Sequence, residues 1–244
     1  MARKHLLLAL GVAALALWSA GGAQTAPTDD AAAAIRGRAV FEGTAPKPAP
    51  ILMATDAVCR SSRTEPAYPE ALVVSADGGL QNVFVYVKRG LDGKSFPAPT
   101  EPARIEQKGC QYTPHVLGLR AGQALEIINS DSTLHNIHAW PSKNTPFNLG
   151  QPRQGMRSTR TFESPEVMVP LRCDVHSWMN GYIGVVDHPF FAITGDGGTF
   201  AIEALPPGDY VLEAWHEKLG VQTQNIKVTS NQGVEVQFVF KGRP

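Results

Sequence analysis

The sequence predicts an all-β protein built from short strands packed as β-sandwiches. Apolar side chains alternate with a period of two in short runs, as they do in strands with two unlike faces. These runs lie at residues 83–87, 125–127, 167–171, 182–186 and 234–240. Turn sequences rich in glycine and aspartate separate the runs, at residues 77–79, 92–93 and 195–198. A weak helical pattern is confined to residues 52–59.

The first 23 residues have the pattern of a secretory signal. Arg3 and Lys4 precede an apolar stretch over residues 6–18, and small residues at 21–23 provide a cleavage site. The stretch is too short to cross a membrane as a mature helix. We therefore expect an exported protein, soluble after cleavage, that is periplasmic in a cell with two membranes and secreted otherwise.

Residues 24–34 are rich in alanine, threonine and aspartate and are predicted to form a flexible lead-in. Without the signal, 20 basic residues stand against 22 acidic ones, which gives no basic surface for nucleic acid. About 220 mature residues suffice for one large or two modest domains. We place the first domain at residues 35–187. A loop at 141–155, rich in proline, asparagine and glycine, is expected to lie over or beside its functional site.

The most informative motif is Cys173-x2-His176-x2-Met179. It lies in a predicted connection, residues 172–180, between two strands. A cysteine, a histidine and a methionine spaced by three residues in one tight loop can surround a small ion. A thiolate, imidazole and thioether are the donors of blue-copper electron-transfer sites, which also need a second imidazole.

The second imidazole is expected from the sequence His135-Asn136-Ile137-His138. In a strand, His135 and Ile137 lie on one face, and Asn136 and His138 on the other, so both histidines cannot reach one ion without a bulge. We choose His135 because it follows a turn-rich segment. Asn136 is expected to hydrogen-bond the backbone of the cysteine loop and thereby hold the thiolate.

This combination of motifs resembles the cupredoxins, the type 1 blue-copper proteins, and the loop is most similar to that of amicyanin and plastocyanin. The resemblance implies a Greek-key β-sandwich and one type 1 copper ion bound by His135, Cys173, His176 and Met179. Zinc is the competing metal, but it rarely takes a thioether ligand. Met179 can instead be a core residue, which would leave the axial position open.

Three cysteines leave one unpaired in an exported protein. If Cys173 is a copper thiolate, Cys59 and Cys110 are left to form a disulfide. Closing that loop stabilises a fold by roughly 4 kcal/mol on the chain-entropy model. A disulfide that includes Cys173 is the alternative.

Residues 188–244 are predicted to form a second, small β-sandwich module, beginning near His188-Pro189. Two strands flank a Pro206-Pro207-Gly208 turn, a pattern that resembles transthyretin-like and carboxypeptidase-regulatory β modules. A unit of about 55 residues has a marginal core of its own, so we expect it to pack on the copper domain. Three further histidines, at positions 115, 138 and 216, are expected to be ordinary structural residues rather than ligands.

The sequence therefore favours an electron carrier that shuttles single electrons, not an enzyme, because four protein ligands leave no open position for a substrate. The resemblance implies that electrons leave through His176, with Trp178 and Tyr182 as candidates for a docking surface. The expected partner is a cytochrome c or an exported dehydrogenase or oxidase. Alternatives are a copper storage or delivery module, an oxidoreductase with a modified copper site, and a structural sandwich with a vestigial site.

Overall fold

The computed structural model describes residues 33–53, 55–230 and 232–242, so the predicted signal at 1–23 lies outside the described residues. The first strand, β1 (Ala33–Glu42), begins within the range 24–34 predicted to be a flexible lead-in. The remaining strands before residue 140 are β2 (Phe84–Arg89), β3 (Ala103–Lys108), β4 (Gln111–Thr113), β5 (Val116–Arg120), β6 (Ala124–Asn129) and β7 (His135–Ala139). Those after it are β8 (Phe147–Gln151), β9 (Arg157–Thr161), β10 (Glu166–Arg172), β11 (Asn180–Val186), β12 (Phe191–Ile193), β13 (Thr199–Leu205), β14 (Gly208–His216), β15 (Gly220–Val228) and β16 (Val234–Lys241).

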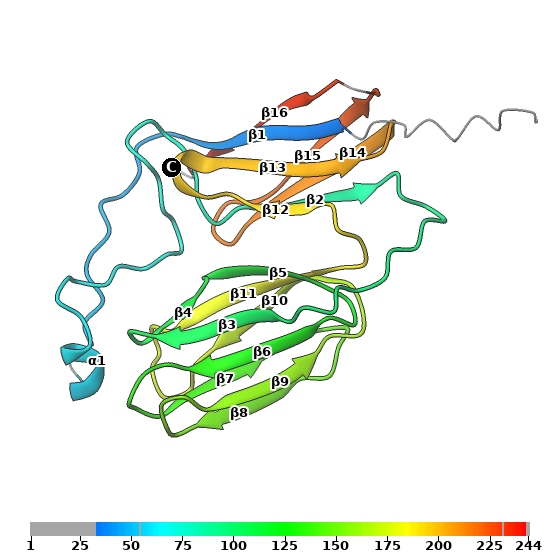
Figure 1. The fold of residues 1–244 in the computed structure, drawn as a ribbon. Helices are drawn as coiled ribbons and strands as arrows, with labels where there is room; N and C mark the ends of the chain where they lie inside the picture. The colour runs from blue at the N-terminus through cyan, green and yellow to red at the C-terminus, as the bar shows by residue number, and fades with distance from the viewer. Residues whose placement is uncertain (1–32, 54, 231, 243–244) are drawn as a thin grey trace, which may run out of the picture.

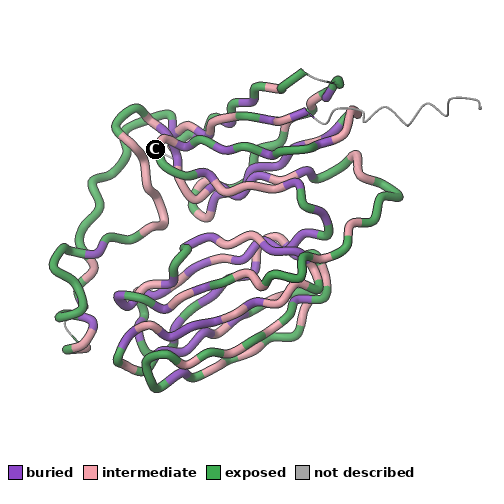
Figure 2. The backbone as a smooth tube through the Cα atoms, in the orientation of Figure 1, coloured by how far each residue is buried: buried purple, intermediate pink, exposed green. Residues whose placement is uncertain are grey.

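These strands form four sheets stacked as two sandwiches, which confirms the predicted all-β fold (Figure 1). The upper sandwich in Figure 1 consists of the sheets β13-β1-β16 and β12-β2-β14-β15. The lower sandwich consists of the sheets β5-β11-β10-β7-β8 and β4-β3-β6-β9. Buried positions alternate with exposed ones along many strands, so each sandwich encloses its own apolar core (Figure 2).

Phe84 of β2 joins the two sandwiches. Its ring is fully buried in a small apolar cluster between the sheet of β2 and the sheet of β11. A Cβ atom on Gly184 of β11 would lie 2.6 Å from that ring, and one on Gly118 of β5 would lie 2.3 Å from the ring of Phe191. Glycine at these two positions therefore lets the aromatic rings of the upper sandwich rest on the backbone of the lower one.

The strand pairing does not follow the predicted division at residue 188. β1 pairs in parallel with β16 and antiparallel with β13, and β2 pairs with β12 and β14. The upper sandwich thus takes two strands from before residue 188 and five from after it. A module of 188–244 alone would lack the strands that complete both of its sheets. Whether 35–187 and 188–244 behave as separate domains stays a prediction.

The long connection between β1 and β2 leaves the upper sandwich and lies beside the end of the lower sandwich that holds the β3–β4 turn (Figure 1). We call residues 44–53 and 55–69 the capping segment. It contains the short helix α1 (Ala57–Ser61), slightly later than the helix predicted at 52–59. Asp56 is the N-cap residue of α1, and its Oδ1 accepts a hydrogen bond of 2.9 Å from the Cys59 amide. The segment is fastened to the β3–β4 turn by a Cys59–Cys110 disulfide and a bond from Arg63 Nε to the Gly109 carbonyl.

The stretch at 141–155 is not a continuous loop as predicted, because it contains β8. This strand pairs with all of β7, from His135 opposite Gln151 to Ala139 opposite Phe147. Alternating apolar residues are few in β8, which explains why the sequence pattern missed it. Among the described residues, no helix has the length and apolar character needed to span a membrane.

Candidate metal centre

The loop between β10 and β11 has the predicted limits and is closed by its own backbone. β10 ends at Arg172 and β11 begins at Asn180. The Cys173 amide donates to the Met179 carbonyl at 3.1 Å, and the Met179 amide donates to the His176 carbonyl at 2.9 Å. These bonds turn the chain back on itself, so the side chains of Cys173 and His176 face the same space.

β7 supplies His135 to that space. His135, Ile137 and Ala139 are buried on one face, as the strand pattern predicted, because this face packs into the core of the lower sandwich. His135 Nδ1 lies 3.0 Å from His176 Nδ1, and Cys173 Sγ lies 3.8 Å from His176 Nδ1. One donor atom from each of the three residues fits within 4.8 Å of the others.

The spacing of these atoms fits a metal ion. With metal–nitrogen bonds of about 2.0 Å, an ion would span the two Nδ1 atoms at a nitrogen–metal–nitrogen angle of about 100°. With a metal–sulfur bond of about 2.3 Å, it would span Cys173 Sγ and His176 Nδ1 at a sulfur–metal–nitrogen angle of about 125°. Such angles suit a three-coordinate arrangement of two imidazoles and one thiolate, which is the strong-ligand set of a type 1 copper site. All three side chains are almost completely buried, so water would be kept from an ion held between them.

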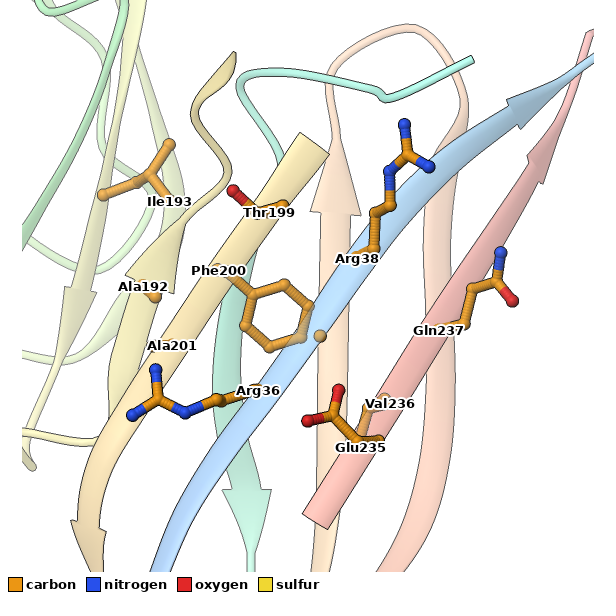
Figure 3. A pocket seen from close by; sticks show the side chains of 11 residues that line it. Arg36, Arg38, Ala192, Ile193, Thr199, Phe200, Ala201, Glu235, Val236 and Gln237 are labelled. Carbon is orange, nitrogen blue, oxygen red and sulfur yellow. The ribbon is translucent and has the colours of Figure 1, made fainter. Parts of the chain in front are cut away.

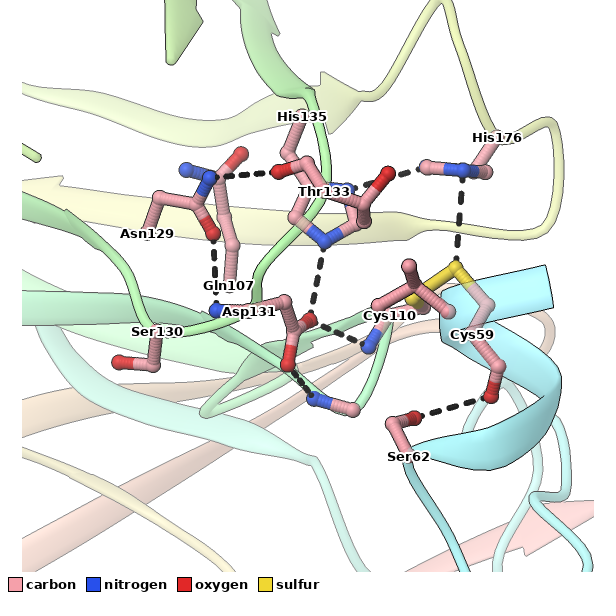
Figure 4. Close-up of polar contacts among 12 residues, drawn as sticks. Cys59, Ser62, Gln107, Cys110, Asn129, Ser130, Asp131, Thr133, His135 and His176 are labelled. Carbon is pink, nitrogen blue, oxygen red and sulfur yellow. Dashed lines mark hydrogen bonds and ion pairs between the residues drawn. A yellow bond between two sulfur atoms is a disulfide. The ribbon is translucent and has the colours of Figure 1, made fainter. Parts of the chain in front are cut away.

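The hydrogen-bond partner of the Nε2 atom of each imidazole shows which ring nitrogen carries hydrogen. His135 Nε2 lies 2.9 Å from Asp131 Oδ2 (Figure 4). His176 Nε2 lies 3.1 Å from Asp56 Oδ2. A carboxylate only accepts, so both Nε2 atoms are the donors. Two neutral rings would then point their Nδ1 lone pairs at each other across 3.0 Å. That arrangement requires a cation between them, either a metal ion or a proton.

Without a metal, the proton resides on His135. Burial lowers the pKa of this imidazole. The hydrogen bonds to Asp131 and Cys173 and the negative charges of these residues raise it by more, so that the pKa reaches about 9. Burial lowers the pKa of His176, and the carboxylate of Asp56 only partly opposes the shift. His135 can therefore donate its Nδ1 hydrogen to His176 in the metal-free protein. Burial raises the pKa of the Cys173 thiol, yet hydrogen bonding to His135 brings it below its ordinary value. The pocket thus already favours a thiolate beside a cation.

The sequence analysis did not identify Asp131 or Asp56. Asp131 is also held in place by the β3–β4 turn, because its two oxygens accept hydrogen bonds from the Gly109 and Cys110 amides at 2.8 Å each (Figure 4). Its position four residues before His135 was visible in the sequence, but it read only as part of a turn. Asp56 lies 120 residues from His176, and no local pattern joins them.

The predicted contact of Asn136 with the cysteine loop is present. Its Oδ1 accepts from the Asp174 amide at 2.7 Å and lies 3.2 Å from Cys173 Sγ. Its Nδ2 donates to Asn148 of β8 and to the Asp174 carboxylate. β8 therefore supports Asn136, whose side chain fixes the backbone next to Cys173. This agrees with the expectation that 141–155 lies beside the site.

Met179, the predicted axial ligand, is buried in the same apolar cluster as Cys173. Its place in the loop, next to the Cys173 amide, is compatible with either role, and its ligation stays a prediction. His115, His138 and His216 do not join the cluster of donors. His138 faces Asp174 and stacks on Trp140, with ring centroids 3.6 Å apart, His115 pairs with Glu217, and the ring of His216 lies 6.1 Å from that of Phe240.

The disulfide is Cys59–Cys110, so Cys173 is free and the alternative pairing is wrong. Its sulfur atoms lie behind the two imidazoles. Cys59 Sγ is 3.6 Å from His176 Nε2, and Cys110 Sγ belongs to a compact group with Asp131 and His135 (Figure 4). His176 is 2% exposed as a result. The edge of His176 that the resemblance assigned to electron exit is covered by the capping segment.

A hollow on the outer sheet β13-β1-β16 is a separate feature (Figure 3). Arg36 and Arg38 extend over it, and their guanidinium groups pair with Glu203 and Asp77. It contains no histidine or cysteine and offers no set of metal donors.

Comparison with known proteins gives partial structural matches only. No protein-family model matches the chain, and no curated protein matches it. The chain is similar to a purple cupredoxin from Nitrosopumilus maritimus, with 24% identity and a TM-score of 0.30 over 34% of this chain and 98% of that one. It is similar to a copper-containing nitrite reductase from Thermus scotoductus SA-01, with 21% identity and a TM-score of 0.32 over 41% of this chain and 26% of that one. An oxidised proline-to-alanine variant of amicyanin has 20% identity and a TM-score of 0.31 over 34% of this chain and 81% of that one.

Proposed function

We propose that this protein is an exported mononuclear type 1 copper protein that carries single electrons between redox partners. The observation that carries the proposal is the pair of imidazole Nδ1 atoms 3.0 Å apart with a buried cysteine sulfur 3.8 Å from one of them. His135, Cys173 and His176 would hold the ion, with Met179 as a weak fourth ligand. Bound copper would supply a Cu(I)/Cu(II) couple that takes and gives one electron with little rearrangement.

The protein contributes rigidity around that couple. The cysteine loop is closed by backbone hydrogen bonds, Asn136 fixes the loop backbone at Asp174, and Asp131 orients His135. Groups that are already oriented change little when the charge of the ion changes, which is what rapid electron transfer requires. A site filled by protein side chains and closed to water binds no substrate at the metal, so a carrier is favoured over an enzyme.

The partner is proposed to be a cytochrome c or an exported dehydrogenase or oxidase. Because His176 is covered, docking would use the neighbouring surface of the ligand loop. Val175 is 47% exposed and directly precedes His176, while Leu134 is 43% exposed and directly precedes His135. Trp178 donates to the Cys110 carbonyl beneath the capping segment, and Tyr182 packs on Trp215 between the sandwiches, so neither is offered as the docking surface.

The test is a Cu(II) titration of the metal-free protein, followed by its visible spectrum. We expect one equivalent to bind with intense blue or purple absorption from the thiolate, and Cys173→Ser to abolish the colour while the fold persists. His135→Ala should open a coordination position that external imidazole fills, whereas the matched variant His138→Ala should behave as wild type. A colourless complex that exchanges copper slowly would contradict the carrier and indicate storage or delivery.

A further inference from the structure

The capping segment places a carboxylate on the back of His176. Asp56 Oδ2 lies 3.1 Å from His176 Nε2 and also accepts from Thr133 Oγ1 at 3.0 Å. Its other oxygen accepts from the Cys59 amide at the start of α1. With both oxygens engaged and Cys59 tied to Cys110, Asp56 has little freedom to move away from the ring.

This contact dictates how His176 can bind a metal. An acceptor beside Nε2 keeps the hydrogen on that nitrogen, so the lone pair of Nδ1 is left free to bind a metal. The ring plane is fixed at the same time, because it is held between Asp56 on one edge and the site on the other. Asp131 does the same for His135.

The two carboxylates also add charge. Their side chains are 20% exposed for Asp56 and 8% exposed for Asp131, so solvent screens them only in part. With the thiolate, three negative groups surround the proposed ion. Their attraction is greater for a doubly charged than for a singly charged ion, so they stabilise Cu(II) relative to Cu(I).

We infer that Asp56, which the disulfide-anchored capping segment carries, is a positioning residue: it holds His176 as an Nδ1 ligand and lowers the reduction potential of the copper. This inference rests on the proposed copper function. It goes further in making a segment that belongs to neither sheet of the lower sandwich part of the control of the metal centre. A purely structural Asp56 would serve only as the N-cap of α1.

Asp56→Asn separates the two roles. Asparagine is as good an N-cap as aspartate, so α1 is preserved. With its oxygen kept on the Cys59 amide, its amide NH₂ group faces the His176 Nε2 hydrogen, and the negative charge is gone. Asp56→Ser keeps the cap with a side chain too short to reach His176, and it provides a second variant. Asp209→Asn removes an exposed charge from β14 in the other sandwich and serves as the control.

The first readout uses metal-free, ¹⁵N-labelled protein and needs no copper. Nitrogen–proton correlation spectra report which ring nitrogen carries hydrogen. Because His135 also donates to His176 Nδ1 in the metal-free protein, the comparison is made in a His135→Ala background, which removes that second donor. In that background we expect Nε2–H at His176 with Asp56 present and with Asp209→Asn, and a shift toward Nδ1–H with Asp56→Asn. An unchanged His176 tautomer in both Asp56 variants would overturn the positioning role.

The second readout is the reduction potential of the copper-loaded proteins by protein-film voltammetry. Asp56→Asn and Asp56→Ser should both raise it, and Asp209→Asn should leave it at the wild-type value. Equal potentials in all four proteins, or an equal rise in Asp209→Asn, would overturn the inference. Failure of wild type to bind copper would instead refute the proposed function, and the tautomer would still decide whether Asp56 positions His176.

Discussion

Removing the Cys59–Cys110 disulfide should destabilise the protein by an amount that follows from its place in the chain. The bridge joins residues 51 positions apart, and closing a loop of that length removes about 4 kcal/mol of chain entropy from the unfolded state. Both sulfurs are buried, at 1% and 0% exposure for Cys59 and Cys110, so truncation to alanine adds the loss of two small apolar groups. At about 1 kcal/mol for each, the expected loss of unfolding free energy is about 5–6 kcal/mol.

The perturbation is the double variant Cys59→Ala/Cys110→Ala, measured by urea unfolding of the metal-free protein. Cys173→Ala is the matched control, because it truncates a buried cysteine that closes no loop. Amide hydrogen exchange over residues 55–69 would show whether the capping segment opens before the sandwiches do. The reasoning is refuted if the double variant unfolds within about 1 kcal/mol of the control, since a loop constraint of this size then makes no contribution.

Two further predictions concern the axial ligand and the pH dependence of stability. Met179→Gln should lower the reduction potential and Met179→Leu should raise it, because an amide oxygen favours Cu(II) more than a thioether does and leucine offers no donor; voltammetry showing three coincident potentials would make Met179 a core residue. Burial lowers the pKa of His216 from 6.5 to about 4, so the unfolded chain takes up a proton that the folded one refuses, and stability falls by about 3 kcal/mol as the pH drops from 6.5 to 4. His216→Asn should flatten that part of the pH profile of unfolding; parallel profiles for His216→Asn and wild type would contradict the assignment.

Much of the fold could be predicted because strands with one buried face repeat every two residues. The pattern at 83–87 gave β2, 167–171 gave most of β10, and 234–240 gave β16. β8 escaped because only two apolar residues, Phe147 and Leu149, alternate in it, which is too short a run to stand out in a segment rich in proline, asparagine and glycine. The pairing of β1 with β16 escaped for another reason. Periodicity identifies a strand and its buried face but carries no information about which distant strand lies beside it.

The donor cluster was accessible to sequence reasoning because three of its four proposed residues lie in one loop. Strand alternation was enough to choose His135 over His138, and the structure brings His135 Nδ1 toward Cys173 and His176. The carboxylates behind the histidines were not accessible. Asp56 approaches His176 only because the capping segment crosses from one sandwich to the far end of the other, which is a tertiary event.

The order in which the strands are synthesised differs from the order in which they can pair. The lower sandwich is contiguous, from β3 to β11, so all of its partners have emerged once residue 186 is made. The upper sandwich cannot close until β16 is complete, because β16 is the parallel neighbour of β1 and is the last strand to be synthesised among the described residues. β2 and β12, which flank the lower sandwich in sequence, lie side by side, with Tyr86 opposite Phe191. The chain therefore enters and leaves the lower sandwich at adjacent points, the geometry of a domain inserted into a host. A nascent chain can fold the insert first and use its closely spaced ends to bring the two halves of the host together.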